Sequence, residues 1–239
     1  MFDIHSHILP NVDDGAEDLA ESLELLSLMK SQGVTDVMAT PHFYPHEDNL
    51  SEFTKKTAEA YRILLEAVSG KEMPNIYLGC EILYFEGMGH SQSLGELCLN
   101  GSSYLLIELT DECIRDSLMT NIKYLKDNSD IIPIIAHVER YYRSKNYRKF
   151  IKFLKKENII VQINASSILE RAYERIIQKL IKAELRIIIG SDAHSVAIRP
   201  PKLDKALSTV AQKYGKQCYD RILRNMNIIF KNIVTDGDF

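Results

Sequence analysis

Two pairs of side chains with metal-ligating chemistry stand two positions apart in the sequence: His5 with His7, and Asp192 with His194. Side chains at positions i and i+2 of a strand project to the same side, so each pair can bind one ion. Taken alone, His5 and His7 fit polar surface residues equally well, because histidine also serves in that role. The second pair follows the apolar run 187–190, where a helix cap would explain the aspartate but not the histidine.

Two glutamates also stand where apolar runs end. Glu81 closes the run 76–81, and Glu108 stands near the end of the run 104–109. An ionised carboxylate in such a position is costly unless a cation or a hydrogen-bond network balances it. A capping or salt-bridging glutamate is the alternative interpretation of each residue.

The complete candidate set combines imidazole and carboxylate ligands and contains no thiolate. Such ligands suit Mn²⁺, Fe²⁺ or Zn²⁺, and they exceed what one tetrahedral ion needs, so we predict two or three divalent metal ions. The predicted ligands are His5, His7, Asp14, His42, Glu81, Glu108, His137, Asp192 and His194. Asp13 is a further carboxylate in the same region, whereas His46 and His90 lie in loop-like stretches and are interpreted as surface residues.

A polynuclear metal centre lowers the pKa of bound water and supports in-line displacement at phosphorus, so phosphate-ester hydrolysis is the expected reaction. That reaction needs cations for the non-bridging phosphate oxygens, and the planar guanidinium group matches phosphate geometry. Arg140 closely follows His137, and Arg199 closely follows His194. We predict that Arg140 and Arg199 bind the phosphate and act in catalysis, with a structural ion pair as the alternative for each.

These residues need a scaffold that brings them together, and the sequence indicates a parallel sheet. Short apolar runs alternate with segments of helical periodicity, such as 168–183 and the segment that ends at Gly33. The predicted strands are 2–4, 35–40, 76–81, 104–109, 131–137, 159–164 and 186–190. Almost all candidate ligands lie at or just beyond the ends of these runs, where parallel β/α folds build their active sites. We expect one α/β domain over residues 1–239, closed into a distorted (β/α)7 barrel like a TIM barrel.

Charge and composition disfavour several other classes of protein. The formal net charge is −4, which argues against a nucleic-acid-binding protein, because affinity for the phosphate backbone comes from clustered Lys and Arg. We find no secretory signal pattern and no long apolar run, so we expect no membrane span and a cytoplasmic location. The segment 143–156 is locally basic, with apolar residues at helical spacing. We interpret it as a solvated helix face, with a docking surface for an acidic partner as the alternative.

The spaced pairs and their surroundings resemble the polymerase and histidinol phosphatase (PHP) superfamily, whose chains open with H-x-H and close their site with D-x-H. The similarity is greatest to one branch, the bacterial capsule- and exopolysaccharide-regulating tyrosine-protein phosphatases (CpsB/YwqE-like), and extends over nearly the whole chain. The matching segments are DIHSHILP (3–10), VDDG (12–15), PH (41–42), GCEI (79–82), IAHVERY (135–141) and SDAH (191–194). The stretches 43–49 and 87–100 depart from the family pattern, which leaves the choice of substrate open.

The resemblance implies a PHP fold, a metal-dependent protein-tyrosine phosphatase and manganese as the usual metal. The implied ligand sets are His5, His7, Glu81 and Asp192 for one ion, Glu81 as a bridge with Glu108 and His137 for a second, and Asp14, His42 and His194 for a third. It further implies that Arg140 and Arg199 contact the phosphate. The implied substrate is the tyrosine-rich tail of a bacterial kinase that controls capsule or exopolysaccharide synthesis.

Many tyrosine phosphatases of other folds use a cysteine in a C-x5-R loop, and Cys218 and Arg224 have this spacing. The intervening residues contain no glycine to turn backbone amides toward a phosphate, and they are typical of a helix. A helix interior does not supply the positive environment that activates a thiolate. We therefore reject a cysteine nucleophile and interpret the cysteines as buried or incidental thiols.

Hydrolysis of phosphotyrosine is the expected reaction, and other functions are alternatives to it. Phenolate, with a pKa near 10, is a good leaving group that needs little help from a general acid. The alternative within the same class is a small-molecule phosphomonoesterase such as a histidinol phosphatase. The alternative from another class is a non-catalytic metal-binding adaptor for a kinase, which would not need both arginines. A proofreading exonuclease is disfavoured by the acidic net charge.

Overall fold

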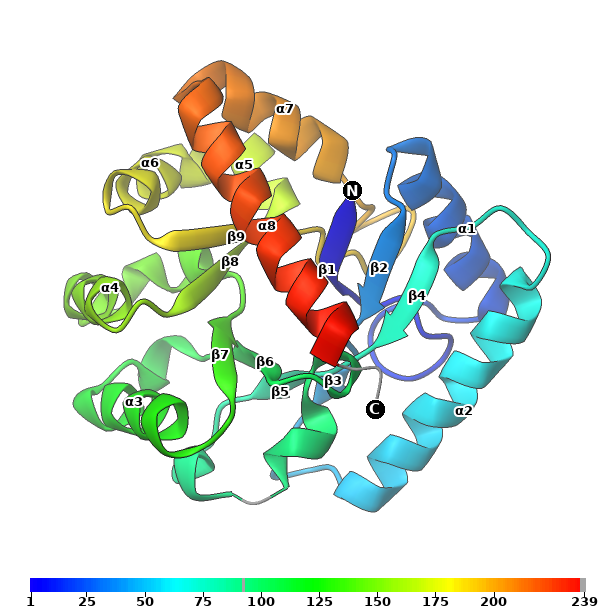
Figure 1. Ribbon diagram of the computed structural model, residues 1–239, viewed down its shortest axis with the longest axis horizontal. Coiled ribbons are helices and arrows are strands. Elements are labelled where there is room, and N and C mark those ends of the chain that lie inside the picture. The colour runs from blue at the N-terminus through cyan, green and yellow to red at the C-terminus, as the bar shows by residue number, and fades with distance from the viewer. Residues whose placement is uncertain (92, 237–239) are drawn as a thin grey trace.

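The computed structural model describes residues 1–91 and 93–236, and Figure 1 shows its strands at the centre with helices around them. Residues 92 and 237–239 of the predicted domain lie outside the described residues. The strands are β1 (Phe2–Ser6), β2 (Asp36–Ala39), β3 (His42–Phe43), β4 (Asn75–Leu78), β5 (Glu81–Leu83), β6 (Tyr104–Glu108), β7 (Ile132–Ile135), β8 (Ile160–Asn164) and β9 (Arg186–Gly190).

Helices follow most of the strands. The α-helices are α1 (Leu19–Ser31), α2 (Leu50–Val68), α3 (Asp116–Asn128), α4 (Tyr147–Lys156), α5 (Ala165–Leu169), α6 (Glu174–Lys182), α7 (Leu203–Tyr214) and α8 (Lys216–Asp236). The short 3₁₀ helices are η1 (Met88–His90), η2 (Leu94–Leu97), η3 (Leu99–Gly101), η4 (Asp111–Cys113), η5 (Val138–Arg143) and η6 (Arg171–Tyr173). Among the helices of the described residues, none combines the length and the hydropathy that crossing a lipid bilayer requires.

The first helix shows how local sequence sets the boundaries of an element. Asp18 precedes α1, and its carboxylate accepts a hydrogen bond from the Glu21 N–H at 2.9 Å, which caps the helix. Gly33 follows the end of α1 with φ +79°, a left-handed conformation that glycine adopts without steric cost. The predicted helix that stops at Gly33 is therefore confirmed.

The strands of the described chain pair in parallel and form two sheets, in the orders β1-β2-β4 and β3-β5-β6-β7-β8-β9. An isolated parallel bridge between Ser6 and Ala193 joins β1 to the segment after β9. Beside it, the Asp192 N–H donates to the His5 carbonyl at 2.9 Å, and the His7 N–H donates to the Ala193 carbonyl at 2.8 Å. The predicted α/β fold with parallel strands is confirmed, whereas the pairing gives two open sheets and does not establish the predicted closed barrel.

The predicted strand 35–40 is confirmed as β2 and is followed by a short strand, β3, that was not predicted, whereas the predicted strand 76–81 is divided into β4 and β5. The run 35–40 ends in β2, and the chain resumes as β3 after Pro41, which has no N–H for the ladder. The run 76–81 ends in β4, and the chain resumes as β5 after a break at Gly79, which packs against η3. Each break moves the chain from one sheet to the other, because β2 pairs with β4 while β3 pairs with β5. Glu81 therefore opens β5 instead of closing a strand.

Two further boundaries differ from the prediction. The predicted helix 168–183 is divided into α5, η6 and α6, because Glu170 leaves the helical region with φ −86° and ψ 125°. The predicted strand 131–137 ends earlier, at Ile135. His137 has a positive φ of 29°, which lies outside the range of backbone angles found in strands. His137 is thereby placed on a turn rather than on a strand.

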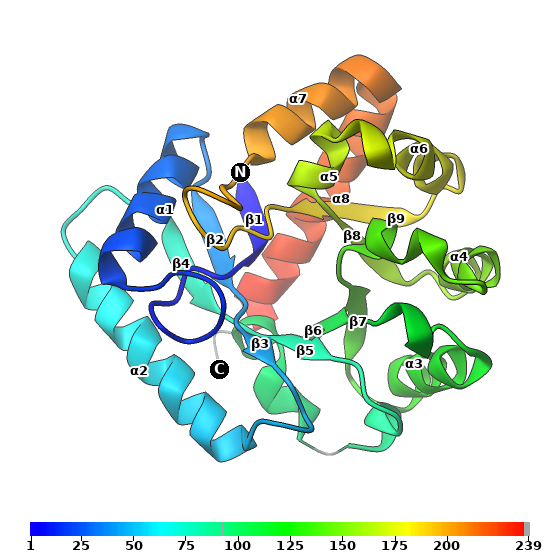
Figure 2. The same cartoon turned by 180° about the vertical axis from the view of Figure 1, so that it is seen from behind.

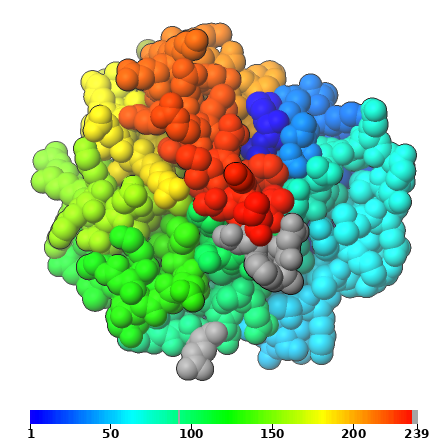
Figure 3. Space-filling model, in the orientation of Figure 1, coloured from blue at the N-terminus to red at the C-terminus, as the bar shows by residue number. Residues whose placement is uncertain are grey.

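Helix α8 lies across the amino ends of the strands, as Figures 1 and 3 show. Phe2 of β1 stacks on Phe230 of α8 with ring centroids 4.3 Å apart, and the Asn225 side chain donates to the Ile187 carbonyl at 3.0 Å. In the opposite view of Figure 2, α8 lies behind the strands, and the loops that follow them face the viewer. The strands thus have one end covered by a helix and one end formed by loops.

Candidate metal centre

The two spaced pairs are held together by backbone hydrogen bonds at the carboxyl ends of β1 and β9. The bonds from Asp192 and His7 described above fix the ends of these strands side by side. Gly190 permits this approach, because a Cβ atom there would lie only 2.8 Å from the Cβ of His5. The side chains of His5 and His7 then point the same way, with their Nε2 atoms 3.1 Å apart. The predicted alignment of the H-x-H pair is confirmed.

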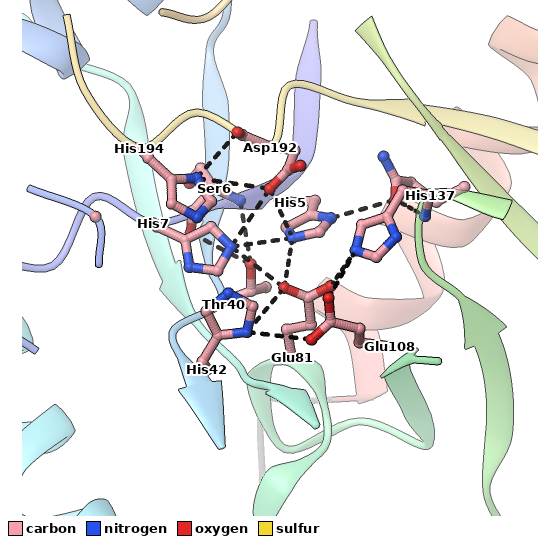
Figure 4. Close-up of polar contacts among 12 residues, drawn as sticks. His5, Ser6, His7, Thr40, His42, Glu81, Glu108, His137, Asp192 and His194 are labelled. Atoms are coloured by element: carbon pink, nitrogen blue, oxygen red, sulfur yellow. Dashed lines mark hydrogen bonds and ion pairs between the residues drawn. The ribbon is translucent and has the colours of Figure 1, made fainter. Parts of the chain in front are cut away.

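Glu81 lies at the centre of the cluster, as Figure 4 shows. Its Oε2 atom is 3.0 Å from His5 Nε2, 3.3 Å from His7 Nε2 and 3.3 Å from His42 Nδ1. Its Oε1 atom is 2.9 Å from His137 Nε2. The register of β3 against β5 places His42 directly beside Glu81. One fully buried carboxylate therefore faces four imidazole rings.

Ligand atoms within 4.8 Å of one another define three groups that could each hold an ion. The groups are His5, His7, Glu81 and Asp192; His42, Glu81 and Glu108; and His7, Asp14, His42 and His194. The first group equals one ligand set implied by the resemblance, and the third contains another. In the second group His42 takes the place expected for His137, although His137 Nε2 also lies 3.5 Å from Glu108 Oε1.

Two buried nitrogen atoms in the cluster have no hydrogen-bond partner among the described residues, namely His42 Nδ1 and His194 Nε2. Both face carboxylates, since His42 Nδ1 is 3.3 Å from Glu81 and His194 Nε2 is 3.3 Å from Asp14. A buried polar atom without a partner is costly, and a shared cation between the nitrogen and the carboxylate would remove that cost. The donor set of this chain therefore fits divalent metal ions.

The electrostatics of the cluster show the same need for positive charge. Burial opposes a charge on His7, but the carboxylates of Asp13 and Glu81 outweigh it and raise the pKa of His7 to about 10. Burial and the negative charge of Glu81 raise the pKa of Glu108 to about 7. In both cases a proton neutralises charge that the buried carboxylates leave uncompensated. A divalent cation can take the place of these protons, because metal ligands bind in their deprotonated forms.

The second nitrogen of several rings is held by a residue outside the ligand set. His7 Nδ1 is 2.7 Å from Asp13 Oδ2, and His5 Nδ1 is 3.2 Å from Gln162 Oε1. Such partners fix the ring orientation and the tautomer, so that the other nitrogen is free to bind an ion. Asp13 also accepts the His42 N–H at 2.9 Å. Asp13 thus lies behind the candidate ligand His7 and belongs to none of the groups that could hold an ion.

Gln162 and Asn164 of β8 form a polar chain that our sequence analysis missed. The Gln162 Nε2 donates to Asn164 Oδ1 at 2.7 Å, and Asn164 Nδ2 donates to Asp192 Oδ2 at 2.5 Å. Gln162 Oε1 also accepts the His137 N–H at 2.7 Å. The signal was present in the sequence, because two polar residues at i and i+2 of an otherwise apolar strand share one face.

The two predicted arginines meet at one carboxylate oxygen. Arg140 Nη2 donates to Asp192 Oδ2 at 2.7 Å, and Arg199 Nη2 donates to the same atom at 2.5 Å. Their side chains are 36% and 35% exposed, whereas Asp192 is buried. The guanidinium groups therefore lie between the cluster and solvent, where an entering anion would meet them.

Two candidate ligands have left-handed backbones, since φ is 29° at His137 and 53° at Asp192. This conformation is strained for residues with a side chain and persists where the surroundings enforce it. At Asp192 it turns the side chain toward His5 immediately after β9, with Asp192 Oδ1 at 3.5 Å from His5 Nε2.

The remaining sequence predictions concern residues outside the cluster. His46 and His90 are exposed, as predicted for surface residues. Cys218 lies in α8 with Arg224, and burial raises the pKa of its thiol, as expected for a residue outside the chemistry. All of the predicted ligands lie together, and Asp14, at 65% exposure, forms the open edge of the set.

Comparisons with known proteins agree on one family. The sequence profile described as "Capsular polysaccharide synthesis, CpsB/CapC" matches residues 1–231. CapC of Staphylococcus aureus, provisionally named a tyrosine-protein phosphatase, is 32% identical over an alignment of 240 residues that covers 97% of this chain and 92% of that protein. The tyrosine-protein phosphatase CpsB of Streptococcus agalactiae serotype V is 29% identical over 251 residues, with 97% and 99% covered.

A solved structure is also similar over most of its length. It comes from the crystal structures of YwqE from Bacillus subtilis and CpsB from Streptococcus pneumoniae, which are described as metal-dependent tyrosine phosphatases. The TM-score is 0.80 at 25% sequence identity, with 97% of this chain and 95% of that chain covered.

Proposed function

Since the chain belongs to the capsular polysaccharide synthesis family CpsB/CapC, we propose that it is a metal-dependent protein-tyrosine phosphatase. The observation that carries this proposal is the set of imidazoles and carboxylates around the buried Glu81, with Arg140 and Arg199 beside it. Metal ligands and phosphate-binding cations thus stand within one site.

The proposed ligands of two or three divalent ions are His5, His7, Asp14, His42, Glu81, Glu108, His137, Asp192 and His194. The three groups of ligand atoms described above support eight of these residues, and the distances from His137 Nε2 to Glu81 (2.9 Å) and Glu108 (3.5 Å) support the ninth. Bound divalent ions would supply a hydroxide nucleophile near neutral pH and neutralise charge on the phosphoryl oxygens. Manganese is the proposed metal, with Fe²⁺ and Zn²⁺ as alternatives, because all three accept nitrogen and oxygen ligands.

The proposed role of Arg140 and Arg199 is to bind the non-bridging oxygens of the phosphoryl group. Each guanidinium can exchange its bond to Asp192 Oδ2 for a bond to phosphate, since both side chains are partly exposed. The phosphorus atom of a phosphoryl group bound by the two arginines would face the proposed metal ligands. The phenolate of tyrosine then leaves with little help from a general acid.

A protein substrate is preferred to a small molecule because the site has an open edge. Asp14 and the two arginines on that edge are each at least a third exposed. We propose the phosphotyrosine tail of a bacterial kinase that controls capsule synthesis as the substrate, in keeping with the name of the family. A histidinol phosphatase remains the alternative enzyme, and a metal-binding adaptor is disfavoured because it would not need both arginines.

The same proposal includes two expectations about the fold and one about cellular location. We propose that the two sheets act as one distorted (β/α)7 barrel, which the bridge between Ser6 and Ala193 supports. We propose that residues 1–239 form a single phosphatase domain, since the family profile covers residues 1–231. A cytoplasmic location also stays a prediction.

The test compares substrates after metal removal and reconstitution. Protein stripped with EDTA should not hydrolyse p-nitrophenyl phosphate, and added Mn²⁺ should restore turnover. Among phosphotyrosyl peptide, phosphoseryl peptide and histidinol phosphate, the first should have the highest kcat/KM. Turnover that survives complete chelation, verified by elemental analysis, would exclude the metal mechanism. A preference for histidinol phosphate would select the alternative enzyme, and metal binding without any turnover would select the adaptor.

A further inference from the structure

A groove of about 590 Å³ lies on the outer surface between α4 and α6, two helices that Figures 1 and 2 place next to each other. Its floor includes the apolar side chains of Tyr147, Ile151 and Ile176. Its basic lining residues are Lys145, Arg148, Lys152, Arg175 and Lys179. Among the residues that the structure describes, no Asp or Glu lines it. We refer to this feature as the α4–α6 groove.

The cations of the groove are unpaired, in contrast to their neighbours on the same helix. Within the described chain, none of the five basic lining residues has a carboxylate partner within 4.0 Å. Two other lysines of α4, which do not line the groove, are paired: Lys149 lies 2.7 Å from Asp116, and Lys155 lies 3.5 Å from Glu184. A chain of net charge −4 thus keeps a concentrated, uncompensated positive charge at one concave place.

The short helix η5 contributes one residue to the proposed active site and one to the groove. Arg140 of this short helix bonds to Asp192, and Tyr142, two residues later, lines the groove. Tyr142 is 37% exposed, and its ring packs edge-on against Tyr173 with centroids 6.1 Å apart. A chain that leaves the site past Arg140 would therefore meet Tyr142 and then the groove.

We infer that the α4–α6 groove binds an acidic segment of the phosphotyrosine protein, close in sequence to the tyrosine that is hydrolysed. This inference rests on the proposed function. Carboxylates of the segment would pair with the unpaired cations, and its apolar side chains would contact the floor. A long polyanion such as a nucleic acid fits less well, because the chain has a net charge of −4 and a long phosphate backbone would extend beyond the groove.

The test uses phosphotyrosyl peptides that differ only in flanking charge. One has glutamates about three to eight residues from the phosphotyrosine, a range that an extended chain covers at about 3.3 Å per residue. The other has glutamines at the same positions, and both are made with the flank on either side. The wild-type protein should hydrolyse one of the acidic peptides with a KM about fivefold lower than that of its neutral counterpart, and added salt should remove the difference.

A matched pair of double variants distinguishes an effect of the groove cations from a general effect of positive charge on α4. Arg148→Gln/Lys152→Gln removes two groove cations from α4, and Lys149→Gln/Lys155→Gln removes two paired cations from the same helix. The groove variant should lose the preference for the acidic peptide, with kcat and p-nitrophenyl phosphate turnover unchanged. The control variant should keep the preference within about twofold. Equal loss in both variants, or no preference in the wild type on either flank, would overturn the inference.

A binding measurement distinguishes failure of this inference from failure of the proposed function. Fluorescence anisotropy with the unphosphorylated acidic peptide should show binding that the groove variant weakens, whether or not the protein hydrolyses any phosphate ester. Binding of single-stranded RNA or anionic vesicles that is weakened by the groove variant, with no effect on the acidic peptide, would contradict the inference. Circular dichroism melting curves should show that both variants fold like the wild type.

Discussion

The strands use buried side chains in opposite ways at their two ends, the amino ends under α8 and the carboxyl ends at the cluster of candidate ligands. At the amino ends Phe2 stacks on Phe230, and Ile229 and Ile233 of α8 are fully buried. In the ligand cluster at the opposite side, His5 and Glu81 are equally buried but polar. Burial of apolar surface stabilises the fold by about 25 cal/mol per Å², whereas burial of ionisable groups costs free energy.

The difference indicates that the two ends have separate tasks. The apolar end contributes stability without any ligand. The polar end holds charge that only protons or cations can neutralise, and the raised pKa values of His7 and Glu108 are the consequence. Substitutions at the carboxyl ends should therefore act on metal binding and turnover, and substitutions at the amino ends on stability.

The largest effect is expected for Glu81→Ala, which removes the carboxylate that faces four imidazoles. Turnover should fall by more than about a hundredfold, because even the outer partners of metal ligands cost 10- to 100-fold when they are removed. Elemental analysis should find less than the wild-type metal content. Glu24→Ala, an exposed glutamate on α1, is the control. Full activity of Glu81→Ala would contradict a shared metal ligand at this position.

A smaller effect on activity is expected for Arg199→Ala. Loss of one guanidinium should lower kcat/KM by about 10- to 100-fold, because charge-assisted bonds to the phosphate are lost, while the metal content stays unchanged. Steady-state kinetics and elemental analysis measure the two quantities separately. Arg224→Ala, which removes an exposed arginine of α8, should leave both unaffected. Unaltered kinetics in Arg199→Ala would mean that this arginine only stabilises Asp192.

The reverse result, lower stability with unchanged activity, is expected for Ile229→Ala in α8, at the amino ends of the strands. This side chain is fully buried in α8, so its truncation should lower the free energy of unfolding by about 3 kcal/mol. Metal content and kcat of the folded protein should remain at wild-type values. Denaturant titration followed by circular dichroism gives the first quantity. Exposed Ile228→Ala on the same helix serves as the control. A loss of bound metal in Ile229→Ala would show that the two ends are coupled.

The smallest effect is expected for Cys218→Ser. Cys218 lies in α8, the helix at the amino ends of the strands, and burial raises the pKa of its thiol. We therefore expect that it does not act as a nucleophile. Turnover should stay within about twofold of the wild type. An inactive variant would indicate that Cys218 is the nucleophile. So would a phosphorylated intermediate that the wild type forms and this variant does not.

Much of the site could be predicted because its ligands follow recognisable patterns. The pairs H-x-H and D-x-H and the carboxylates beside apolar runs identified the residues that the structure brings together. The resemblance to the CpsB/YwqE-like phosphatases is likewise confirmed by the family profile and by the solved structure. The H-x-H prediction rested on alternation along a strand, which is a local property that the chain carries by itself.

Other features depend on contacts between distant segments, and one sequence does not display them. Asp13 carries the same charge as a ligand, yet it lies behind His7 because the loop before α1 returns to β1. Gln162 reaches both His5 and the backbone of His137 only because β8 lies beside β7 and β9. The breaks at Pro41 and Gly79 have a visible local cause, but their result, a change of sheet, is decided by strand pairing.

By itself, the sequence determined which side chains are available for metal chemistry and that they follow the strands of a parallel α/β fold. Side-chain type and the period of two are local, so they need no knowledge of the neighbours. Only the tertiary structure decided that Glu81 faces four rings, that both arginines meet at Asp192, and that Arg148 and Lys152 of α4 line a groove. Those relations depend on the register and packing of segments far apart in the chain, which short-range preferences do not specify.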